Sequence, residues 1–359
     1  MTVERHGLRD LGWDDRWEAA FAEHAARGFA AGRICLEQRG AWHVLTTRGE
    51  LPASLAGRLR HEATGRPDLP VVGDWVALTV APDGASARIE AVLPRRSAFA
   101  RRLAGAAAEA QVLAANLDVV FLVSGLDGDY NPRRIERAVT LAWESGARPV
   151  VVLNKADLCD EVEERLAEVA GVAPGVPVHA TRGLEGAGLE VFTTELRPGV
   201  AGALLGSSGV GKSTIINRLL GRDELATASV REHDSRGRHT TTHRELFVLP
   251  GGGLLVDTPG LREFGMWGEG SGLGATFADI DALAPDCRYR DCRHADEPGC
   301  AVRQAVDEGR LDPDRLASFH KLAKELAFLH RQVDQRAALE EKRRWKSIHK
   351  MAKKFKPRT

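Results

Sequence analysis

The fold of this chain is decided by the stretch Ala203-Leu204-Leu205-Gly206-Ser207-Ser208-Gly209-Val210-Gly211-Lys212-Ser213-Thr214. It matches the pattern G-x-x-x-x-G-K-[ST], in which a glycine-rich loop joins an apolar strand to a helix, here expected over residues 215–220. The backbone N–H groups of such a loop surround a phosphate, and the helix N-terminus adds a favourable dipole. Lys212 is expected to reach the β- and γ-phosphates, and Ser213 to ligate Mg²⁺. The bare pattern arises by chance in roughly one chain in a hundred of this length, but the strand and helix around it favour a nucleotide site.

Length and composition limit the alternatives. With 359 residues the chain is expected to form two or three domains, and 43% hydrophobic residues are enough for buried cores. No apolar run reaches the length of a membrane span, and the N-terminus lacks the apolar region of a signal peptide. We therefore expect a cytoplasmic protein without membrane contact. Because Lys plus Arg and Asp plus Glu number 50 each, the net charge indicates no partner.

Residues 1–31 have the spacing of a short helical extension, and residues 32–104 are expected to form a small β-barrel with a basic linker. Short strands are expected over 34–36, 42–45, 71–78 and 87–92, separated by Gly, Pro and Asp turns. A five-stranded OB-fold fits this length, and such barrels often bind nucleic acid. A structural barrel that only docks on its neighbour is the alternative.

The linker after the barrel is rich in arginine around Phe99. An RNA-facing edge and a solvated linker both explain this composition. The candidate RNA contacts in the linker are Arg95, Arg96, Arg101 and Arg102.

Two apolar strands, expected over 119–124 and 149–153, flank an amphipathic helix. Continuous apolar strands separated by helices indicate a parallel sheet covered on both faces, with ligand loops at the carboxyl ends of the strands. The second strand runs directly into the sequence N-K-A-D. The Asp157 carboxylate can accept hydrogen bonds from guanine N1–H and its exocyclic amine, which adenine does not offer on that edge. Asn154 is expected to hold the loop and approach the base, and the Lys155 stem to lie against the ring.

Three more loops complete a guanine-nucleotide site. Ala180 and Thr181 occupy the position that backs the guanine base in GTPases, although His-Ala-Thr is a loose version of the usual Ser-Ala. Thr241, in a threonine-rich stretch, is a candidate switch residue that closes on Mg²⁺, with a hairpin edge as the alternative. An apolar strand then ends in D-T-P-G, whose Asp257 is expected to hold Mg²⁺ through water and whose Gly260 N–H senses the γ-phosphate.

The order of these elements is not that of an ordinary GTPase. The loops at 154–157 and 180–182 precede the phosphate loop at 206–213, which is followed by 240–242 and 257–260. In the usual nomenclature of GTPase motifs the order is G4-G5-G1-G2-G3, which a circular permutation explains. We expect the permuted α/β P-loop domain to span residues 105–272.

Three of the five cysteines lie close together with a histidine, in the pattern C-x₄-C-x-H-x₅-C. The odd cysteine count and the histidine favour a metal over disulfides, and hence a reducing compartment. Three thiolates and an imidazole suit tetrahedral Zn²⁺ with no open position for water, which is typical of a structural site. Catalytic zinc and a disulfide pair are the alternatives. The expected ligands are Cys287, Cys292, His294 and Cys300, in a mostly helical domain over residues 273–359.

The chain ends in a basic run. Residues 342–359 contain nine Lys or Arg and no acidic residue, with Trp345 and Phe355 interleaved. Such a tail suits an RNA phosphate backbone, and a solvated end is the alternative. The candidate RNA contacts in the tail are Arg343, Arg344, Lys346 and Lys350.

The combination of a β-barrel, N-K-A-D before G-S-S-G-V-G-K-S and D-T-P-G, and a final cysteine–histidine pattern resembles the RsgA (YjeQ) family of ribosome small-subunit-dependent GTPases. The resemblance covers roughly residues 32–300. It implies a cytoplasmic bacterial GTPase that binds Mg²⁺ with GTP, acts in late maturation of the 30S subunit and contacts 16S rRNA. It also implies a candidate catalytic histidine at His239, while Lys212 is the second candidate catalytic residue. We further expect one structural Zn²⁺ per chain and a monomer.

Other functions fit parts of the sequence. A zinc-stapled RNA-binding scaffold would use its nucleotide site only as a switch. Another permuted ribosome-assembly GTPase would share the loop order, and a P-loop kinase or ATPase would share the phosphate loop. Turnover with and without ribosomal subunits separates the scaffold from an enzyme, and a competition between GTP and ATP tests the kinase or ATPase.

Overall fold

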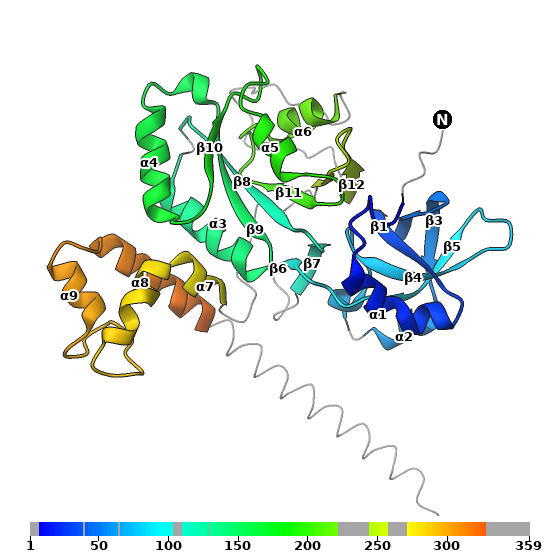
Figure 1. The fold of residues 1–359 in the computed structure, drawn as a ribbon, viewed down its shortest axis with the longest axis horizontal. Helices are drawn as coiled ribbons and strands as arrows, with labels where there is room; N and C mark the ends of the chain where they lie inside the picture. Colours follow the sequence, from blue (N-terminus) through cyan, green and yellow to red (C-terminus); the bar gives the residue numbers. More distant parts are fainter. Residues whose placement is uncertain are drawn as a thin grey trace, which may run out of the picture.

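Figure 1 shows the computed structural model, which describes residues 7–38, 40–63, 65–102, 110–128, 130–221, 244–257 and 271–327. Three parts follow one another along the chain: a β-barrel, an α/β sheet with its helices, and a helical module. The barrel and the helical module lie on different sides of the α/β part. Within the described ranges, no helix combines the length and the apolar character needed to span a membrane.

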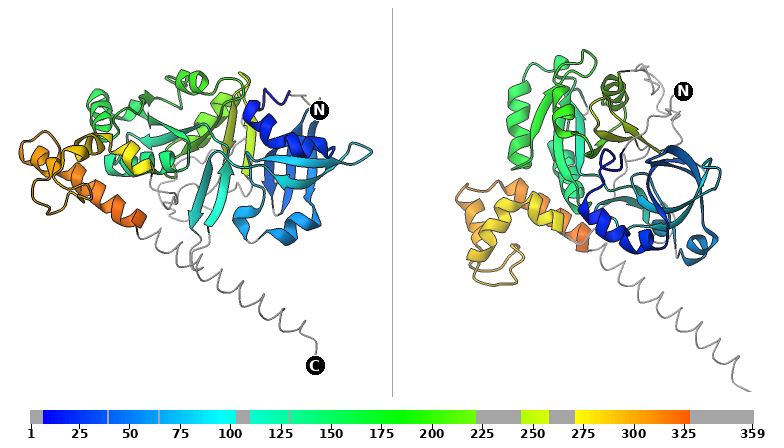
Figure 2. Two further views of the ribbon diagram at one scale, coloured as in Figure 1. Left: turned by 60° about the horizontal axis from the view of Figure 1, so that its bottom comes forward. Right: turned by 45° about the vertical axis from the view of Figure 1, so that its right-hand side comes forward.

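Five strands form the barrel: β1 (Ala30–Gln38), β2 (Ala41–Thr46), β3 (Gly49–Leu55), β4 (Trp75–Val80) and β5 (Ala87–Val92). They pair in the order β1-β2-β3-β5-β4, and β4 pairs with β1 to close the ring, as the right-hand view of Figure 2 shows. The prediction of a five-stranded barrel is therefore confirmed. The sequence pattern did not indicate β3, because Gly49 and Pro52 lie within it and both residues are typical of turns.

Helix α1 (Asp15–Ala26) packs against the barrel. Its first turn is capped by Asp14, whose carboxylate accepts hydrogen bonds from the N–H groups of Arg16 and Trp17. The side chain of Trp17 is buried, and Trp13 lies edge-on to Trp75 of β4 with ring centroids 4.8 Å apart. The segment before β1 therefore contributes to the core of the barrel.

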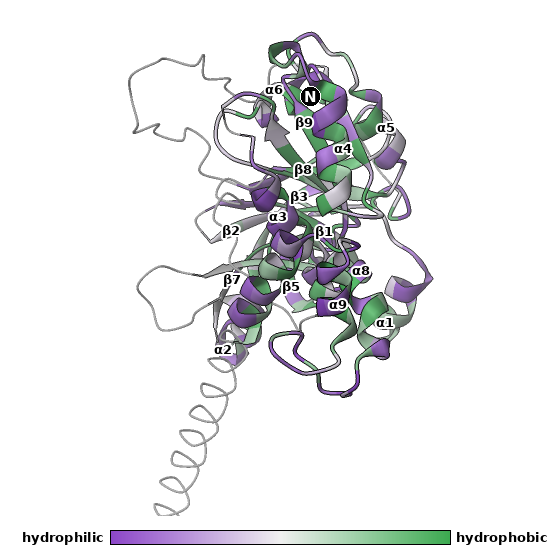
Figure 3. Cartoon of the chain, turned by 90° about the vertical axis from the view of Figure 1, so that its left-hand side faces the viewer, coloured by the Kyte–Doolittle hydropathy of each residue, from purple (hydrophilic) through white to green (hydrophobic). Residues whose placement is uncertain are grey.

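The α/β sheet has five parallel strands and one antiparallel strand. Its order is β10 (Val178–Thr181), β9 (Arg148–Asn154), β8 (Val119–Gly125), β11 (Ala201–Leu205), β13 (Leu254–Asp257) and antiparallel β12 (Arg244–Val248). The accompanying helices are α3 (Pro132–Glu144), α4 (Val162–Val172), α5 (Glu190–Glu195) and α6 (Lys212–Leu220). Along β8, Val120 and Leu122 belong to one hydrophobic core and Phe121 and Val123 to a second. Burial on both faces explains the continuously apolar sequence of β8, whose hydrophobic colour is visible in Figure 3.

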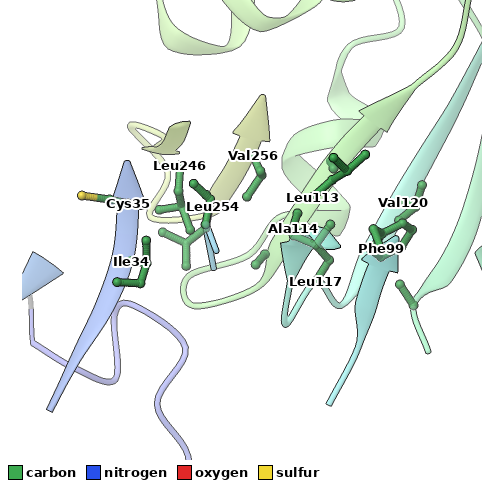
Figure 4. Close-up of a cluster of buried hydrophobic side chains, with 14 of the residues drawn as sticks. Ile34, Cys35, Phe99, Leu113, Ala114, Leu117, Val120, Leu246, Leu254 and Val256 are labelled. Carbon is green, nitrogen blue, oxygen red and sulfur yellow. The ribbon is translucent and has the colours of Figure 1, made fainter. Parts of the chain in front are cut away.

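The α/β sheet continues into the barrel. Strand β12 pairs antiparallel with β1, so that barrel and α/β part share one eleven-stranded sheet. Their side chains also share a core: in Figure 4, Ile34 of β1 faces Leu246 of β12 and Leu254 of β13, while Cys35 points to the other side of β1. The barrel is thus attached to the α/β part by both backbone pairing and apolar packing.

A hairpin of β6 (Ala98–Arg102) and β7 (Ala110–Ala115) lies between the barrel and the α/β part (Figure 1). The predicted domain limit at 104/105 falls between β6 and β7, outside the described residues. The limit at 31/32 falls inside β1, and the limit at 272/273 inside α7 (Ser271–Thr276). Two of the three predicted limits thus fall inside described elements that contact a neighbouring part, and the division into domains stays a prediction.

The helical module consists of α7, α8 (Ala278–Leu283), α9 (Ala301–Asp307) and a helix over residues 313–327. It packs on α3, where Gly272 of α7 comes so close that a β-carbon would lie 2.6 Å from the Thr140 carbonyl oxygen. Buried Arg315 bridges the two parts, because its guanidinium donates to Glu136 Oε1 at 2.8 Å and to Asp279 Oδ1 at 2.9 Å. The described part of the C-terminal region is therefore mostly helical, as predicted.

Candidate nucleotide site and metal centre

The predicted nucleotide loops meet at one edge of the sheet. Strands β9, β10, β11 and β13 are parallel and end at Asn154, Thr181, Leu205 and Asp257. Their carboxyl ends therefore share one edge. The base loop and the 180–182 loop follow neighbouring strands, and the phosphate loop and Asp257 follow another neighbouring pair, with β8 between the two pairs. The loops are contiguous in space although their order in the sequence is permuted.

The buried side chain of Asn154 joins three loops. Its Nδ2 donates to the Val210 carbonyl oxygen of the phosphate loop at 2.8 Å. Its Oδ1 accepts hydrogen bonds from the Gly183 N–H at 2.9 Å and from Thr181 Oγ1 at 3.0 Å. Asn154 therefore holds the base loop, the 180–183 loop and the phosphate loop together, and its contact with a base stays a prediction.

Close packing explains two glycines of the phosphate loop. Gly211 has a φ of 97°, and a β-carbon there would lie 2.4 Å from Asn154 Nδ2. A β-carbon at Gly206 would lie 2.1 Å from the Val123 carbonyl oxygen of β8. Neither position accommodates a side chain, so these glycines allow the loop to lie directly against β8 and the base loop.

Lys212 folds over the phosphate loop. Its ammonium donates to the carbonyl oxygens of Gly206 and Ser207, each at 2.7 Å. Since α6 begins at Lys212, Ser213 and Thr214 lie in its first turn, where N–H groups have no partner within the helix. An ammonium, a hydroxyl and helix N–H groups at one loop suit a phosphate with its cation. The phosphate and Mg²⁺ contacts of residues 206–214 stay predictions.

On the base side, Lys155 and Asp157 have different surroundings. Lys155 has a left-handed backbone with φ 62°, and its Nζ lies 2.5 Å from Asp127 Oδ2. Asp127, just after β8, is a residue that the sequence motifs did not indicate. Asp157 is exposed in a short 3-10 helix (Ala156–Leu158) and forms no hydrogen bond or ion pair with the described residues. Its carboxylate is therefore available to donors such as the guanine edge. Ala180 is half-buried on β10 and pairs with Leu153, the residue before the base loop.

Asp257 ends β13 beside the phosphate-loop strand, because Ala203 of β11 pairs with the preceding residue, Val256. This location agrees with the expected role toward Mg²⁺ without testing it. Other predicted site residues lie outside the described residues: His239, Thr241, Gly260, Arg343, Arg344, Lys346 and Lys350.

The four predicted metal ligands lie together. One donor atom from each of Cys287, Cys292, His294 and Cys300 lies within 4.8 Å of all the others. The Cys287 and Cys300 Sγ atoms are 3.9 Å apart, and they lie 3.6 and 3.5 Å from His294 Nδ1. Tetrahedral Zn²⁺, with bonds of about 2.3 Å to sulfur and about 2.05 Å to nitrogen, requires S–S edges of about 3.8 Å and S–N edges of about 3.6 Å. The three edges among Cys287, Cys300 and His294 therefore fit a tetrahedral ion of that size, and Cys292 lies within 4.8 Å of these donors.

Local structure places these ligands and sets their protonation. His294 has a left-handed backbone with φ 59°, and Cys300 caps α9, its Sγ accepting from the Arg303 N–H at 3.5 Å. Burial lowers the pKa of His294, which favours the neutral imidazole that binds a metal. Burial opposes ionisation of Cys287, but N–H groups that include that of Ala301 outweigh it and hold the pKa of this thiol below its ordinary value. Both effects favour the metal-binding protonation state of these two ligands. In the metal-free cluster, burial and the neighbouring thiols raise the pKa of Cys292 to about 11.

The arginines of the barrel linker are held by protein contacts. The Arg95 guanidinium donates to both carboxylate oxygens of buried Asp74, at 2.8 and 2.7 Å, and also to two backbone carbonyls. These contacts use its donors inside the barrel, which argues against the predicted RNA contact of Arg95. Arg96 is only partly exposed, pairs with Asp14 at 2.7 Å and lies over the Trp17 ring. Arg101 and Arg102 belong to β6, but their side chains lie outside the described part of the structure.

Comparison with known proteins identifies similar chains. A family model described as RsgA GTPase matches residues 92–267. A small ribosomal subunit biogenesis GTPase RsgA from Opitutus terrae is 49% identical over 351 residues, which cover 95% of this chain and 96% of that protein. The crystal structure of YjeQ from Thermotoga maritima is similar with a TM-score of 0.62 and 26% identity, covering 83% of this chain and 99% of that one. The structure of YloQ, described as a circularly permuted GTPase, is similar in fold with a TM-score of 0.58 and 21% identity, covering 86% of this chain and 96% of that one.

Proposed function

This chain belongs to the RsgA GTPase family, and we propose that it hydrolyses GTP on the 30S ribosomal subunit during a late step of the subunit's maturation. The observation that carries the proposal is the meeting of three nucleotide loops around the side chain of Asn154. The name of the Opitutus protein, small ribosomal subunit biogenesis GTPase, supports the assignment of the subunit. We further propose that the protein is a monomer and acts in the cytoplasm.

The spacing of the loops supports a single bound nucleotide. The base loop follows β9 and the phosphate loop follows β11, and these strands are separated by β8 alone. Since neighbouring strands lie about 4.8 Å apart, the two loops are separated by about 10 Å, which one nucleoside triphosphate can span. The exposed carboxylate of Asp157 then meets the guanine edge, and residues 206–214 meet the phosphates with Mg²⁺ held by Ser213 and Asp257. Thr241 and Gly260 complete this site in the proposal.

Hydrolysis is proposed to depend on the subunit. Ras-like GTPases carry a water-orienting glutamine directly after the glycine of D-x-x-G, and here that position is Leu261. A leucine side chain cannot orient the attacking water, so the isolated protein is expected to be slow. We propose that His239 supplies this function on the 30S subunit, while Lys212 stabilises the charge on the phosphates.

The Cys₃His cluster is proposed to bind one Zn²⁺. The described edges of the cluster match those of tetrahedral zinc, and all four donors are protein atoms, as in structural sites. Zinc bound there would fix the loops between α8 and α9 and hold the helical module in shape. The module docks on α3 through Arg315, so the metal supports the placement of the module on the α/β part.

The 16S rRNA is proposed as the RNA partner. The barrel type and the basic run at 342–359, with Arg343, Arg344, Lys346 and Lys350, support this proposal. In the linker, the remaining candidates for RNA contacts are Arg96, Arg101 and Arg102.

Co-sedimentation with separated ribosomal particles tests the function. We expect the protein to pellet with 30S subunits in the presence of a non-hydrolysable GTP analogue and to be released from them in the presence of GDP. It should not pellet with 50S subunits. Binding to 30S that does not depend on the nucleotide would favour the scaffold over a GTPase cycle. Binding to 50S alone would favour another ribosome-assembly GTPase.

A further inference from the structure

A ladder of paired residues leads from the barrel to the candidate magnesium aspartate. Leu36 of β1 lies opposite Glu245 of β12, and Glu245 lies opposite Asp257 of β13. In the neighbouring register position, Glu37 of β1 lies opposite Arg244 of β12. The barrel therefore reaches the carboxyl end of β13 through one intervening residue.

Strand β12 helps to fix the position of Asp257. The pairing of β12 with β13 includes Asp257 itself, which lies opposite Glu245. On its other side, β12 pairs with β1. Without β1, the outer edge of β12 would be an unpaired edge of the sheet, and such edges are free to shift in register.

An ion pair locks the junction between β1 and β12. Arg244 Nη1 lies 2.7 Å from Glu37 Oε2, and the two side chains are 14% and 25% exposed. By contrast, the barrel pair of Arg58 and Glu62 is 75% and 59% exposed. Partial burial strengthens the attraction between opposite charges, because less water screens them. Since the β1–β12 register includes two residue pairs within the described part of the chain, the ion pair at one of them contributes to fixing this register.

We infer that Glu37 and Arg244 are positioning residues for Mg²⁺-dependent nucleotide binding, and that they connect the barrel to the nucleotide site. The inference rests on the proposed function, in which Asp257 holds Mg²⁺. When the ion pair is removed, β12 loses one of its contacts with the barrel, and its hold on Asp257 is weakened. The same connection also acts from the barrel to the nucleotide site. If RNA binding to the barrel displaces β1, the displacement is transmitted through Glu245 of β12 to Asp257.

The test compares the GTP affinity of the full-length protein in excess Mg²⁺ with its affinity in EDTA. Arg244→Gln and Glu37→Gln each remove one charge and keep the size of the side chain. We expect each variant to reduce the Mg²⁺-dependent gain in affinity by about two- to tenfold and to leave the affinity in EDTA unchanged. The exchanged pair Glu37→Arg/Arg244→Glu should restore most of the gain, because the attraction is rebuilt with reversed polarity.

The matched control is Arg148→Gln. Arg148 forms an ion pair with Glu195 at the opposite, amino-terminal end of β9, with exposed fractions of 43% and 22%. This variant should keep the wild-type Mg²⁺ dependence. Equal affinity losses in Mg²⁺ and in EDTA would show a merely structural role and overturn the inference. The inference would also fail if Arg244→Gln and Glu37→Gln kept the wild-type Mg²⁺ dependence, as Arg148→Gln should. It would fail as well if the exchanged pair did not restore the Mg²⁺-dependent gain in affinity. If the wild-type protein itself bound GTP without any effect of Mg²⁺, the proposed function would fail instead.

Discussion

The side-chain amide of Asn154 donates a hydrogen bond to the backbone carbonyl of Val210 at 2.8 Å, so the loop expected to read the base and the loop expected to hold the phosphates are directly joined. The same side chain accepts two further hydrogen bonds from the 181–183 segment. Because the amide is buried, each of these partners would be left unsatisfied by its loss. The candidate nucleotide site is thus organised around a residue whose described contacts are with other parts of the protein.

Replacing Asn154 with Ala should weaken GTP binding by about 1–3 kcal/mol, the usual cost of leaving buried polar groups unpaired. Isothermal titration with GTP and GDP measures this change. The matched control is Asn131→Ala, which removes the cap of α3 and should lower stability without changing nucleotide affinity. Wild-type affinity in Asn154→Ala would contradict the joining role of this side chain.

Replacing Asp157 with Asn should remove the preference for guanine. In the proposed site the exposed carboxylate accepts two donors from the guanine edge, whereas an amide offers a mismatched donor, so we expect a loss of about 1–3 kcal/mol in GTP affinity. A competition between GTP and ATP reports the specificity. Asp160→Asn, an exposed change just beyond the loop, serves as the control. Equal binding of ATP and GTP by the wild-type protein would disprove base reading by Asp157.

Natively purified protein should contain one zinc per chain by elemental analysis. Cys300→Ser should lose the metal, because the remaining three donors no longer complete the tetrahedron. We also expect faster proteolysis of the helical module in this variant, since metal binding contributes to its folding. Cys35→Ser and Cys159→Ser should keep one zinc. Wild-type protein without metal would refute the site. A disulfide between two of Cys287, Cys292 and Cys300 in protein from cells with a reducing cytoplasm would refute it as well.

The capping carboxylate of Asp14 provides a pH-dependent contribution to stability. Burial raises its pKa, but the Trp17 N–H and the Arg96 guanidinium outweigh this effect and hold the pKa below its ordinary value. A carboxyl with a lowered folded-state pKa stabilises the fold above its unfolded pKa and loses this effect as the pH falls through the folded-state value. Asp14→Ala should therefore reduce the free energy of unfolding by about 1 kcal/mol at pH 7. In urea unfolding, the difference from wild type should shrink below about pH 4. A difference that does not change with pH would exclude the charge as its cause.

Local sequence patterns could predict the elements that carry the nucleotide loops. Strands such as β8 and β9 are buried on both faces, so they appear as continuous apolar runs, and the motifs follow them directly. The metal ligands lie within 14 residues of one another, so their spacing alone indicated the cluster. Strand β3 was missed because Pro52 within it is typical of a turn.

Contacts between distant segments could not be predicted from the sequence. Glu37 and Arg244 are 207 residues apart, and no local pattern specifies that β1 pairs with β12. Arg95 lies in a basic stretch that fits an RNA-facing edge or a solvated linker, but its partner Asp74 is 21 residues upstream and buried. The local charge of the sequence includes Arg95, but it cannot show that Asp74 already neutralises this charge.

GTP turnover by the full-length protein, measured with and without purified 30S subunits, tests the central claim most directly. Without subunits we expect slow turnover, on the order of the 10⁻⁴ s⁻¹ that Ras shows without its activator, because Leu261 replaces the water-orienting glutamine. With 30S subunits we expect a rise on the order of a hundredfold or more, which His239→Ala should abolish while GTP and 30S still bind. Equal turnover with and without 30S subunits would contradict the account.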